Sequence, residues 1–211
     1  MFDPKVFILL TPVLLLALTV HEFSHGLVAY LLGDPTPKLA KRLTLNPIKH
    51  LDVFGTLTLF ITQAIGWAKP VPINPNYFKN PWKDMALVSL AGPLSNILLA
   101  FLFGFLFHLF YGLNLNYTSF AVSQPLALMC FLGIKINLGL AIFNLLPIPP
   151  LDGSKILVKF LPKTWRFNYL RLELFGFIFI LILALTGVLG RVIYPILNLA
   201  TNLVLGLTNV F

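Results

Sequence analysis

The sequence VFILLTPVLLLALTVHEFSHGLVAYLL, residues 6–32, decides the class of this protein. The run is longer than the roughly 20 apolar residues that a helix needs to cross the hydrocarbon core of a bilayer. It nevertheless contains His21, Glu22 and His25, although a charged group at the middle of a bilayer costs about 2.5–3.5 kcal/mol. Polar side chains kept at such a cost indicate a function.

The whole chain has the composition of an integral membrane protein. Of its 211 residues, 58% are hydrophobic and 10% are charged, and the mean hydropathy is +0.89, which excludes an ordinary soluble domain. The net charge of +8 comes from Lys and Arg in short loops beside apolar runs, which argues against nucleic-acid binding. The single cysteine, Cys130, excludes an intramolecular disulfide and a cysteine-based metal cluster. The length predicts one membrane-embedded domain, residues 1–211.

The apolar runs predict an all-α polytopic membrane protein with about 4 to 5 transmembrane helices and a three-helix catalytic core. Four runs are comfortably long enough to cross the bilayer, and they occupy residues 6–32, 85–111, 125–146 and 172–190. A fifth run, residues 192–211, is long enough but carries Pro195, Asn198 and Asn202. We expect it to span the membrane or to lie at the interface.

Lys and Arg residues set the expected orientation of these helices. A shorter apolar run, residues 53–68, has basic loops on both sides, so a re-entrant or hairpin excursion is favoured over a crossing. His50, in the first of these loops, is expected to be solvated. Residues 112–124 have no Lys or Arg and are expected outside, whereas the basic residues between 155 and 171 are expected inside. The chain is therefore predicted to be a multi-pass protein of the plasma membrane with its N-terminus outside.

The two histidines of the first run are four residues apart, which brings both rings to one face of a helix. This spacing suits two ligands of one metal ion. Glu22 lies close enough to reach a water at the metal without being a ligand itself. The pattern H-E-x-x-H is typical of zinc hydrolases. The alternative, in which His21, Glu22 and His25 only bond neighbouring helices, has to accept the cost of burying charge in the bilayer.

A catalytic zinc usually has three protein ligands, so a third must come from elsewhere in the chain. Of the remaining histidines and acids, only Asp152 lies in a stretch suited to hold an acid at membrane depth, FNLLPIPPLDG, residues 143–153. Its prolines open the backbone and Gly153 permits a sharp turn. Because the first and third spans both run inward, His21, His25 and Asp152 can meet towards the cytoplasmic side. The alternative for Asp152 is a helix cap in an interfacial loop.

Four motifs resemble those of the site-2 proteases, which are intramembrane zinc metalloproteases. They occur in the family's order and are HEFSH (21–25), GWAKPVPINP (66–75), AGPLSN (91–96) and NLLPIPPLDG (144–153). The chain resembles the compact form, without a PDZ or CBS domain. The resemblance implies an endopeptidase that cleaves transmembrane segments of membrane proteins in regulated intramembrane proteolysis. It also implies that His21, His25 and Asp152 bind Zn²⁺ and that Glu22 is the general base and acid.

The resemblance further implies substrate-binding residues in the second and third spans. Asn144 would position the substrate or stabilise the oxyanion, and an interhelical hydrogen bond is the alternative. Asn96, in AGPLSN, is the weaker candidate. In that motif, Gly92 and Pro93 are better explained by close helix packing beside the site.

The proline-rich stretch AKPVPINP predicts a contact with unwound substrate. A helical substrate hides its peptide bonds, so cleavage requires local unwinding and new partners for the freed backbone groups. Pro70 and Pro72 remove donors from one edge of an extended strand, whereas the donors of Val71 and Ile73 remain on the other edge. We expect residues 71–73 to pair with the substrate by strand addition. A plain connector is the alternative.

Two other functions compete with the protease. A cation transporter would string ionisable residues through several spans, whereas here they converge on one ligand set. An inactive homologue that only binds membrane segments would have no need of Glu22. The expected partners are therefore a transmembrane protein or peptide substrate and the lipid bilayer, with no nucleic acid. The oligomeric state is not predicted.

Overall fold

The computed structural model describes residues 4–53, 55, 57–58, 68–115 and 120–209. The long helices are α1 (Pro4–Leu31), α4 (Pro81–Leu115), α5 (Phe120–Asn144) and α9 (Val188–Thr208). Shorter helices join them, and these are α2 (Thr36–Leu39), η1 (Pro47–His50), η2 (Pro75–Tyr77), α6 (Asp152–Val158), α7 (Lys163–Leu170) and α8 (Glu173–Leu185). Apart from an isolated β-bridge, the described chain is helical or irregular, which confirms the all-α prediction.

Four helical segments are long and apolar enough to cross a membrane. They are Ile8–Leu31, Pro81–Gly112, Val122–Asn144 and Val188–Thr208. A fifth candidate is α7 together with α8, two helices that meet at a bend of 60°. The first three segments coincide with the predicted runs, so the hydrophobic pattern located α1, α4 and α5 correctly.

The boundary between the last two predicted spans was wrong. Helix α8 has only 13 residues, which is too short to cross the bilayer core without α7. Gly187 follows it with a left-handed φ of +72°, and α9 starts at Val188. The run predicted at residues 172–190 is therefore divided by this turn. Hydropathy did not locate the turn because apolar residues continue on both sides of it.

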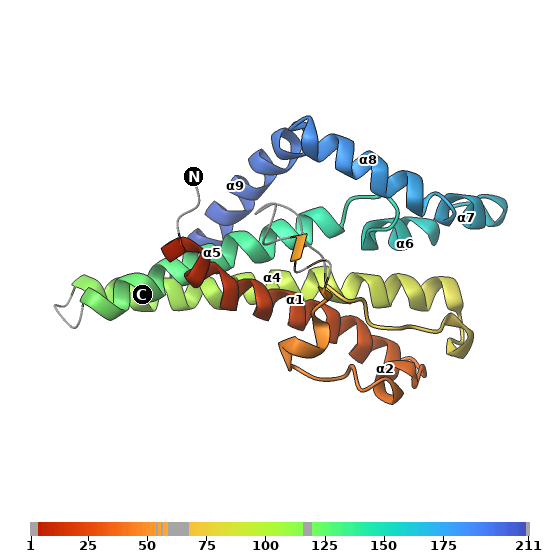
Figure 1. Cartoon of the computed structure of the whole chain (residues 1–211), viewed down its shortest axis with the longest axis horizontal. Helices are drawn as coiled ribbons and strands as arrows, with labels where there is room; N and C mark the ends of the chain where they lie inside the picture. The colour runs from red at the N-terminus through yellow and green to blue at the C-terminus, as the bar shows by residue number, and fades with distance from the viewer. Residues whose placement is uncertain (1–3, 54, 56, 59–67, 116–119, 210–211) are drawn as a thin grey trace.

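Helices α1, α4 and α5 pack together as the predicted three-helix core (Figure 1). Helix α9 packs against α4 and α5 and buries Ala100, Ile134, Leu138 and Val204 in a shared hydrophobic cluster. Figure 1 shows that α8 diverges from the core and that α9 leads the chain back to it. The core helices thus meet around a common centre, which is where the polar residues of α1 lie.

Local hydrogen bonds fix the end of α1 and the start of α4. After α1, Gly33 adopts a left-handed φ of +107°, and the N–H of Asp34 donates back to the carbonyl of Ala29 at 3.0 Å. Before α4, the N–H of Asn80 donates to the carboxylate of Asp84 at 2.9 Å. These caps satisfy backbone groups that the helix ends would otherwise leave unpaired.

The predicted hairpin at residues 53–68 lies largely outside the described residues, because 54, 56 and 59–67 are not described. Its two flanks are described, and they lie side by side. Leu51 and Ala68 form an antiparallel β-bridge, and the N–H of Lys69 donates to the carbonyl of His50 at 2.9 Å. The chain therefore returns to the point at which it left, as a hairpin requires.

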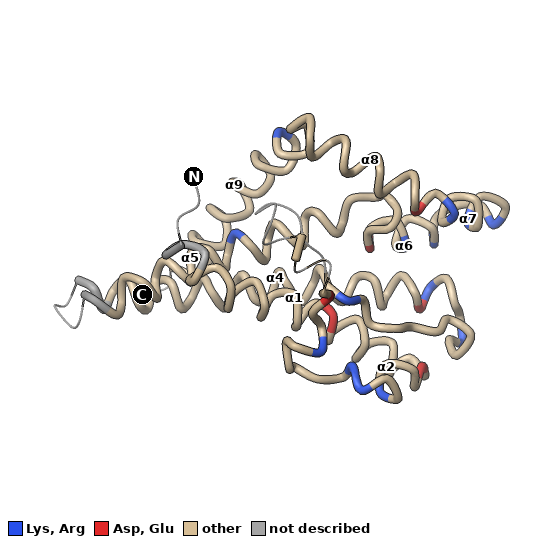
Figure 2. Tube along the Cα trace, in the orientation of Figure 1, with Lys and Arg blue, Asp and Glu red and all other residues tan. Residues whose placement is uncertain are grey.

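Charged residues gather at one end of the molecule. Figure 2 shows most Lys and Arg around α2, α7 and the start of α4, whereas the described residues at the opposite end, where α4 approaches α5, carry no charge. This is the uneven distribution that the positive-inside rule associates with a cytoplasmic face. Which end faces the cytoplasm remains a prediction.

Candidate metal centre and active site

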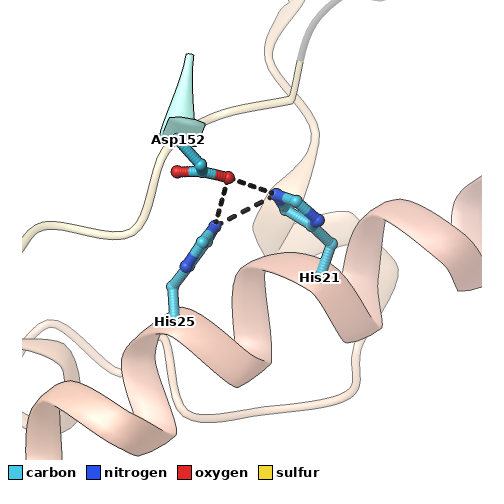
Figure 3. A group of neighbouring side chains, drawn as sticks. All are labelled: His21, His25 and Asp152. Carbon is cyan, nitrogen blue, oxygen red and sulfur yellow. Dashed lines mark hydrogen bonds and ion pairs between the residues drawn. The ribbon is translucent and has the colours of Figure 1, made fainter. Parts of the chain in front are cut away.

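The two histidines of α1 and the first residue of α6 meet at one point (Figure 3). The Nε2 atoms of His21 and His25 are 3.0 Å apart, and Asp152 Oδ2 lies 3.3 Å and 3.2 Å from them, respectively. All three residues are buried, with 6–8% of their surface exposed. Ligands held at ~2.0–2.1 Å in a tetrahedral zinc site stand about 3.3 Å from one another. The triangle therefore has the size of a zinc site.

Hydrogen bonds on the far side of each ring fix which nitrogen faces the triangle. The Nδ1 of His25 donates to the carbonyl of Val88 at 2.7 Å, and the Nδ1 of His21 donates to Asn96 Oδ1 at 2.6 Å. In the neutral imidazoles, both Nε2 lone pairs then point at each other and at the carboxylate of Asp152. Three electron-pair donors repel one another at this distance, and a cation between them removes the repulsion.

A metal ion at this point requires Asp152 as a carboxylate and both imidazoles neutral, because only deprotonated groups are ligands. A carboxylate and two neutral imidazoles are a typical ligand set of catalytic zinc. The donor set and its spacing therefore both fit Zn²⁺.

Helix α4 supports both rings along one face. Val88, Gly92 and Asn96 follow at four-residue intervals, and the first and last of them hold His25 and His21. Gly92 lies between them, where a Cβ atom would stand 2.5 Å from His25 Nε2 and 2.6 Å from His21 Cε1. Only glycine allows α4 to approach the two rings this closely. Gly92 therefore has the packing role that the sequence predicted, and the groups that pack against it are the rings of His21 and His25.

The third donor reaches the triangle because the chain unwinds after α5. Helix α5 ends at Asn144, and the proline-rich segment 145–151 leads to α6, whose first residue is Asp152. Gly153 has no positive φ, so it does not serve a turn as the sequence suggested. A Cβ atom on Gly153 would instead collide with the carbonyl of Leu145. Glycine is therefore required at position 153 because the backbone of Leu145 lies so close to it.

Glu22 lies beside the triangle on a cavity of about 340 Å³. Its Oε2 accepts a hydrogen bond from the N–H of Val71 at 2.9 Å. Ile73 lines the same cavity, and its N–H has no hydrogen-bond partner among the described residues. The predicted strand 71–73 is irregular here rather than paired, since no β-ladder includes it in the described chain. Its backbone nevertheless reaches the carboxylate next to His21.

Comparison with known proteins agrees with this geometry. The chain is 43% identical over 194 residues to "Putative zinc metalloprotease YwhC" of Bacillus subtilis, which covers 92% of this chain and 88% of that protein. The family model for peptidase family M50 matches residues 113–187. This chain belongs to the M50 (site-2 protease) family.

A second relative of the M50 peptidase is "Putative zinc metalloprotease Rip2" of Mycolicibacterium smegmatis, at 32% identity over 190 residues, or 88% of this chain and 70% of that protein. "Putative zinc metalloprotease MJ0611" of Methanocaldococcus jannaschii is 43% identical over 81 residues, 37% of this chain and 35% of that protein. No solved structure gives a significant match. The M50 peptidase is a membrane metalloprotease, as predicted, and not the alternative cation transporter.

The two predicted asparagines of the M50 peptidase lie in different surroundings. Asn144 lines the cavity, and its amide nitrogen donates to the carbonyl of Leu140 in its own helix, so the interhelical bond considered as its alternative is not formed among the described residues. Asn96 is fully buried and does not line the cavity. Its amide donates to the carbonyl of Ala17 and to Asn137 Oδ1. The geometry favours a role for Asn96 in orienting His21 over a contact with substrate.

Among the buried polar residues of the M50 peptidase that sequence reasoning missed are Asp34, Arg42 and His50. Asp34 and Arg42 are 0% and 6% exposed, and both bind the backbone of residues 69–74. His50 is 2% exposed, so the expectation that it is solvated was wrong. Arg42 and His50 lie in a basic loop, whose charges were all attributed to topology. The one available signal was the position of Asp34 directly after the helix that carries the H-E-x-x-H motif.

Proposed function

We propose that this M50 peptidase is an intramembrane zinc endopeptidase that cleaves transmembrane segments of membrane-protein substrates. The observation that carries the proposal is the buried triangle of His21, His25 and Asp152 beside Glu22, on a cavity between helices long enough to cross the bilayer. His21, His25 and Asp152 would hold the ion, and Glu22 would be the catalytic base. A site built within candidate spans suits a peptide bond that lies in the membrane.

A zinc ion held by His21, His25 and Asp152 would act as a Lewis acid and would lower the pKa of water to near neutral. The carboxylate of Glu22 accepts the proton from the attacking water as the new C–O bond forms at the substrate carbonyl. Glu22 then delivers that proton to the amine nitrogen as the peptide C–N bond breaks. Asn96 and Val88 keep His21 and His25 in the orientation that this chemistry requires.

The substrate would bind in an unwound, extended form along residues 71–73. The hydrogen bond between Val71 and Glu22 supports this proposal, because it brings the edge of the segment beside the catalytic carboxylate. The N–H of Ile73, which has no hydrogen-bond partner among the described residues, would bind a substrate carbonyl. Asn144, which also lines the cavity, would contact the substrate or its oxyanion.

In the plasma membrane, we place the N-terminus outside and the active site towards the cytoplasm. The charged end of the molecule in Figure 2 supports this orientation. Because Cys130 is the only cysteine, single cysteines can be introduced into a Cys130→Ser background and labelled from outside intact cells. A cysteine at Lys79 should be protected from an impermeant maleimide in intact cells. Labelling of this position in intact cells contradicts the orientation.

The test of the proposed activity is metal analysis and proteolysis of the protein purified in detergent. We expect about one zinc per chain, reduced by His21→Ala, and cleavage of a model transmembrane peptide. Glu22→Gln should retain zinc and lose cleavage. Glu173→Gln is the matched control, because Glu173 is the other glutamate and is exposed at the start of α8. Equal cleavage by wild type and Glu22→Gln would contradict the mechanism.

A further inference from the structure

The segment 69–74, which borders the active-site cavity, is held at both ends by buried charges of opposite sign. At its start, the guanidinium of Arg42 donates to the carbonyls of Lys69 and Pro70. At its end, Asp34 Oδ2 accepts the N–H of Asn74 at 2.7 Å. Charge-assisted hydrogen bonds are stronger than neutral ones, so the two contacts are effective anchors.

Further contacts hold each of the two anchors, Asp34 and Arg42, in place. Asp34 is fully buried, and its second oxygen accepts the N–H of Thr36 at 2.9 Å. Arg42 is backed by His50, whose Nδ1 lies 3.5 Å from a guanidinium nitrogen and whose Nε2 donates to the carbonyl of Thr44 at 2.8 Å. Because arginine only donates and a carbonyl only accepts, the Nδ1 of His50 faces Arg42 as an acceptor and its Nε2 faces Thr44 as a donor.

The anchored segment faces the catalytic carboxylate. Between the anchors, the N–H of Val71 binds Glu22, and Ile73 lines the cavity. Burial lowers the pKa of the Arg42 guanidinium, and the charge of Glu22 acts in the opposite direction. Arg42 Nε is buried without a hydrogen-bond partner among the described residues. Burying a cation with an unpaired donor costs free energy, which indicates that the other hydrogen bonds of Arg42 compensate for this cost.

We propose that Arg42 and Asp34 are positioning residues, which hold residues 69–74 extended beside Glu22 so that the backbone of residues 71–73 is ready to bind an unwound substrate. This inference rests on the proposed function, since it assigns the residues that prepare its substrate-binding segment. Preorganisation of a binding strand reduces the ordering entropy lost when the substrate binds. The loss of an anchor should therefore raise KM more than it lowers kcat.

The experiment compares Arg42→Met with wild type in the full-length, zinc-loaded protein in detergent. Methionine keeps much of the side-chain length but has no donors. We expect unchanged zinc content, at least tenfold faster hydrogen–deuterium exchange in peptides covering residues 69–74, and at least tenfold lower kcat/KM on a model transmembrane peptide. Arg42→Lys should recover part of both effects. Arg171→Met removes the same charge from an exposed site and should match wild type.

The outcomes separate this inference from the proposed function. If Arg42→Met exchanges and cleaves like wild type, the positioning role is overturned. If it does not fold, Arg42→Lys must show the faster exchange and higher KM with normal zinc content. If neither variant folds, Arg42 is only structural and the proposal fails. If wild type binds zinc but cleaves no transmembrane peptide, the proposed function fails, whereas the exchange data still decide whether Arg42 holds the segment.

Discussion

Substitution of Gly92 by alanine tests whether close packing of α4 shapes the metal centre. The added methyl group would lie 2.5 Å from His25 Nε2, whereas ordinary contact begins near 3.4 Å. One of the two must therefore move by about 0.9 Å. A zinc site tolerates ligand displacements of only ~0.2 Å. The rings cannot swing aside freely, because Val88 and Asn96 hold them by their Nδ1 atoms.

We expect Gly92→Ala to weaken zinc binding at least 100-fold, which corresponds to about 2.7 kcal/mol. The assay is competition between the detergent-purified protein and a fluorescent zinc chelator, followed by cleavage of a model transmembrane peptide at saturating zinc. Gly139→Ala is the matched control, because Gly139 is also helical and a Cβ there meets no atom within 4 Å. Both variants gain the same helix propensity, about 1 kcal/mol over glycine in water.

The zinc affinities of Gly92→Ala and Gly139→Ala together decide whether the steric argument holds. Zinc affinity within threefold of wild type, in a Gly92→Ala variant whose peptidase activity is also normal, would refute the steric argument. A loss that Gly139→Ala shares would trace to glycine in a helix rather than to the rings. Only a loss confined to Gly92→Ala supports the geometry in which α4 presses against the two imidazoles.

Three further substitutions probe other parts of the site. Asn96→Leu removes the acceptor for His21 Nδ1 and should weaken zinc binding about 10–100-fold in the chelator competition, with normal affinity contradicting the orienting role. Gly153→Ala would place a methyl group against the carbonyl of Leu145, and it should lower both the zinc content and the thermal melting temperature. An unchanged melting temperature would argue against that contact. Ile73→Pro removes a backbone donor and should reduce kcat/KM at least tenfold with zinc retained, whereas Ile73→Ala, which keeps the donor, should lose less; equal losses would indicate packing alone.

Much of the fold follows from hydropathy because membrane-spanning helices must satisfy their own backbone groups within one apolar run. This constraint located α1, α4 and α5 without further information. It failed at Gly187, where a single left-handed residue divides an apolar stretch into α8 and α9. A turn between two lipid-compatible helices leaves no mark in hydropathy, and only the glycine itself hinted at it.

The meeting of His21, His25 and Asp152 could be predicted from the sequence because two of the three residues lie one helical turn apart. The spacing of His21 and His25 fixes their common helical face, and Asp152 was the one acid in a proline-broken stretch. The role of Asn96 was not accessible in the same way. A motif gives the position of a residue in the sequence, but it does not show which way the side chain points. The side chain of Asn96 points at His21 and not into the cavity.

The buried anchors Asp34 and Arg42 were missed for a different physical reason. Their partners are backbone carbonyls and an N–H group of residues 69–74, and every residue type except proline offers both groups. No residue pattern in the segment 69–74 therefore marks it as the partner of a charge. The loop charges were consistent with topology alone, so nothing in the sequence separated the anchoring cation from its solvated neighbours.

The packing of α1 against α4 explains how one face of α4 holds both histidine rings in position. Along α1 the two rings are four residues apart, and along α4 the supporting carbonyl, Gly92 and the supporting amide follow at the same interval. The pairing of His21 with Asn96 and of His25 with Val88 requires the two helices to run in opposite directions with Gly92 between the rings. A shift of α4 along α1 by a single turn would break both hydrogen bonds at once. The candidate metal ligands and the packing of the three-helix core are therefore one cooperative unit, so a change that weakens the helix packing should also weaken metal binding.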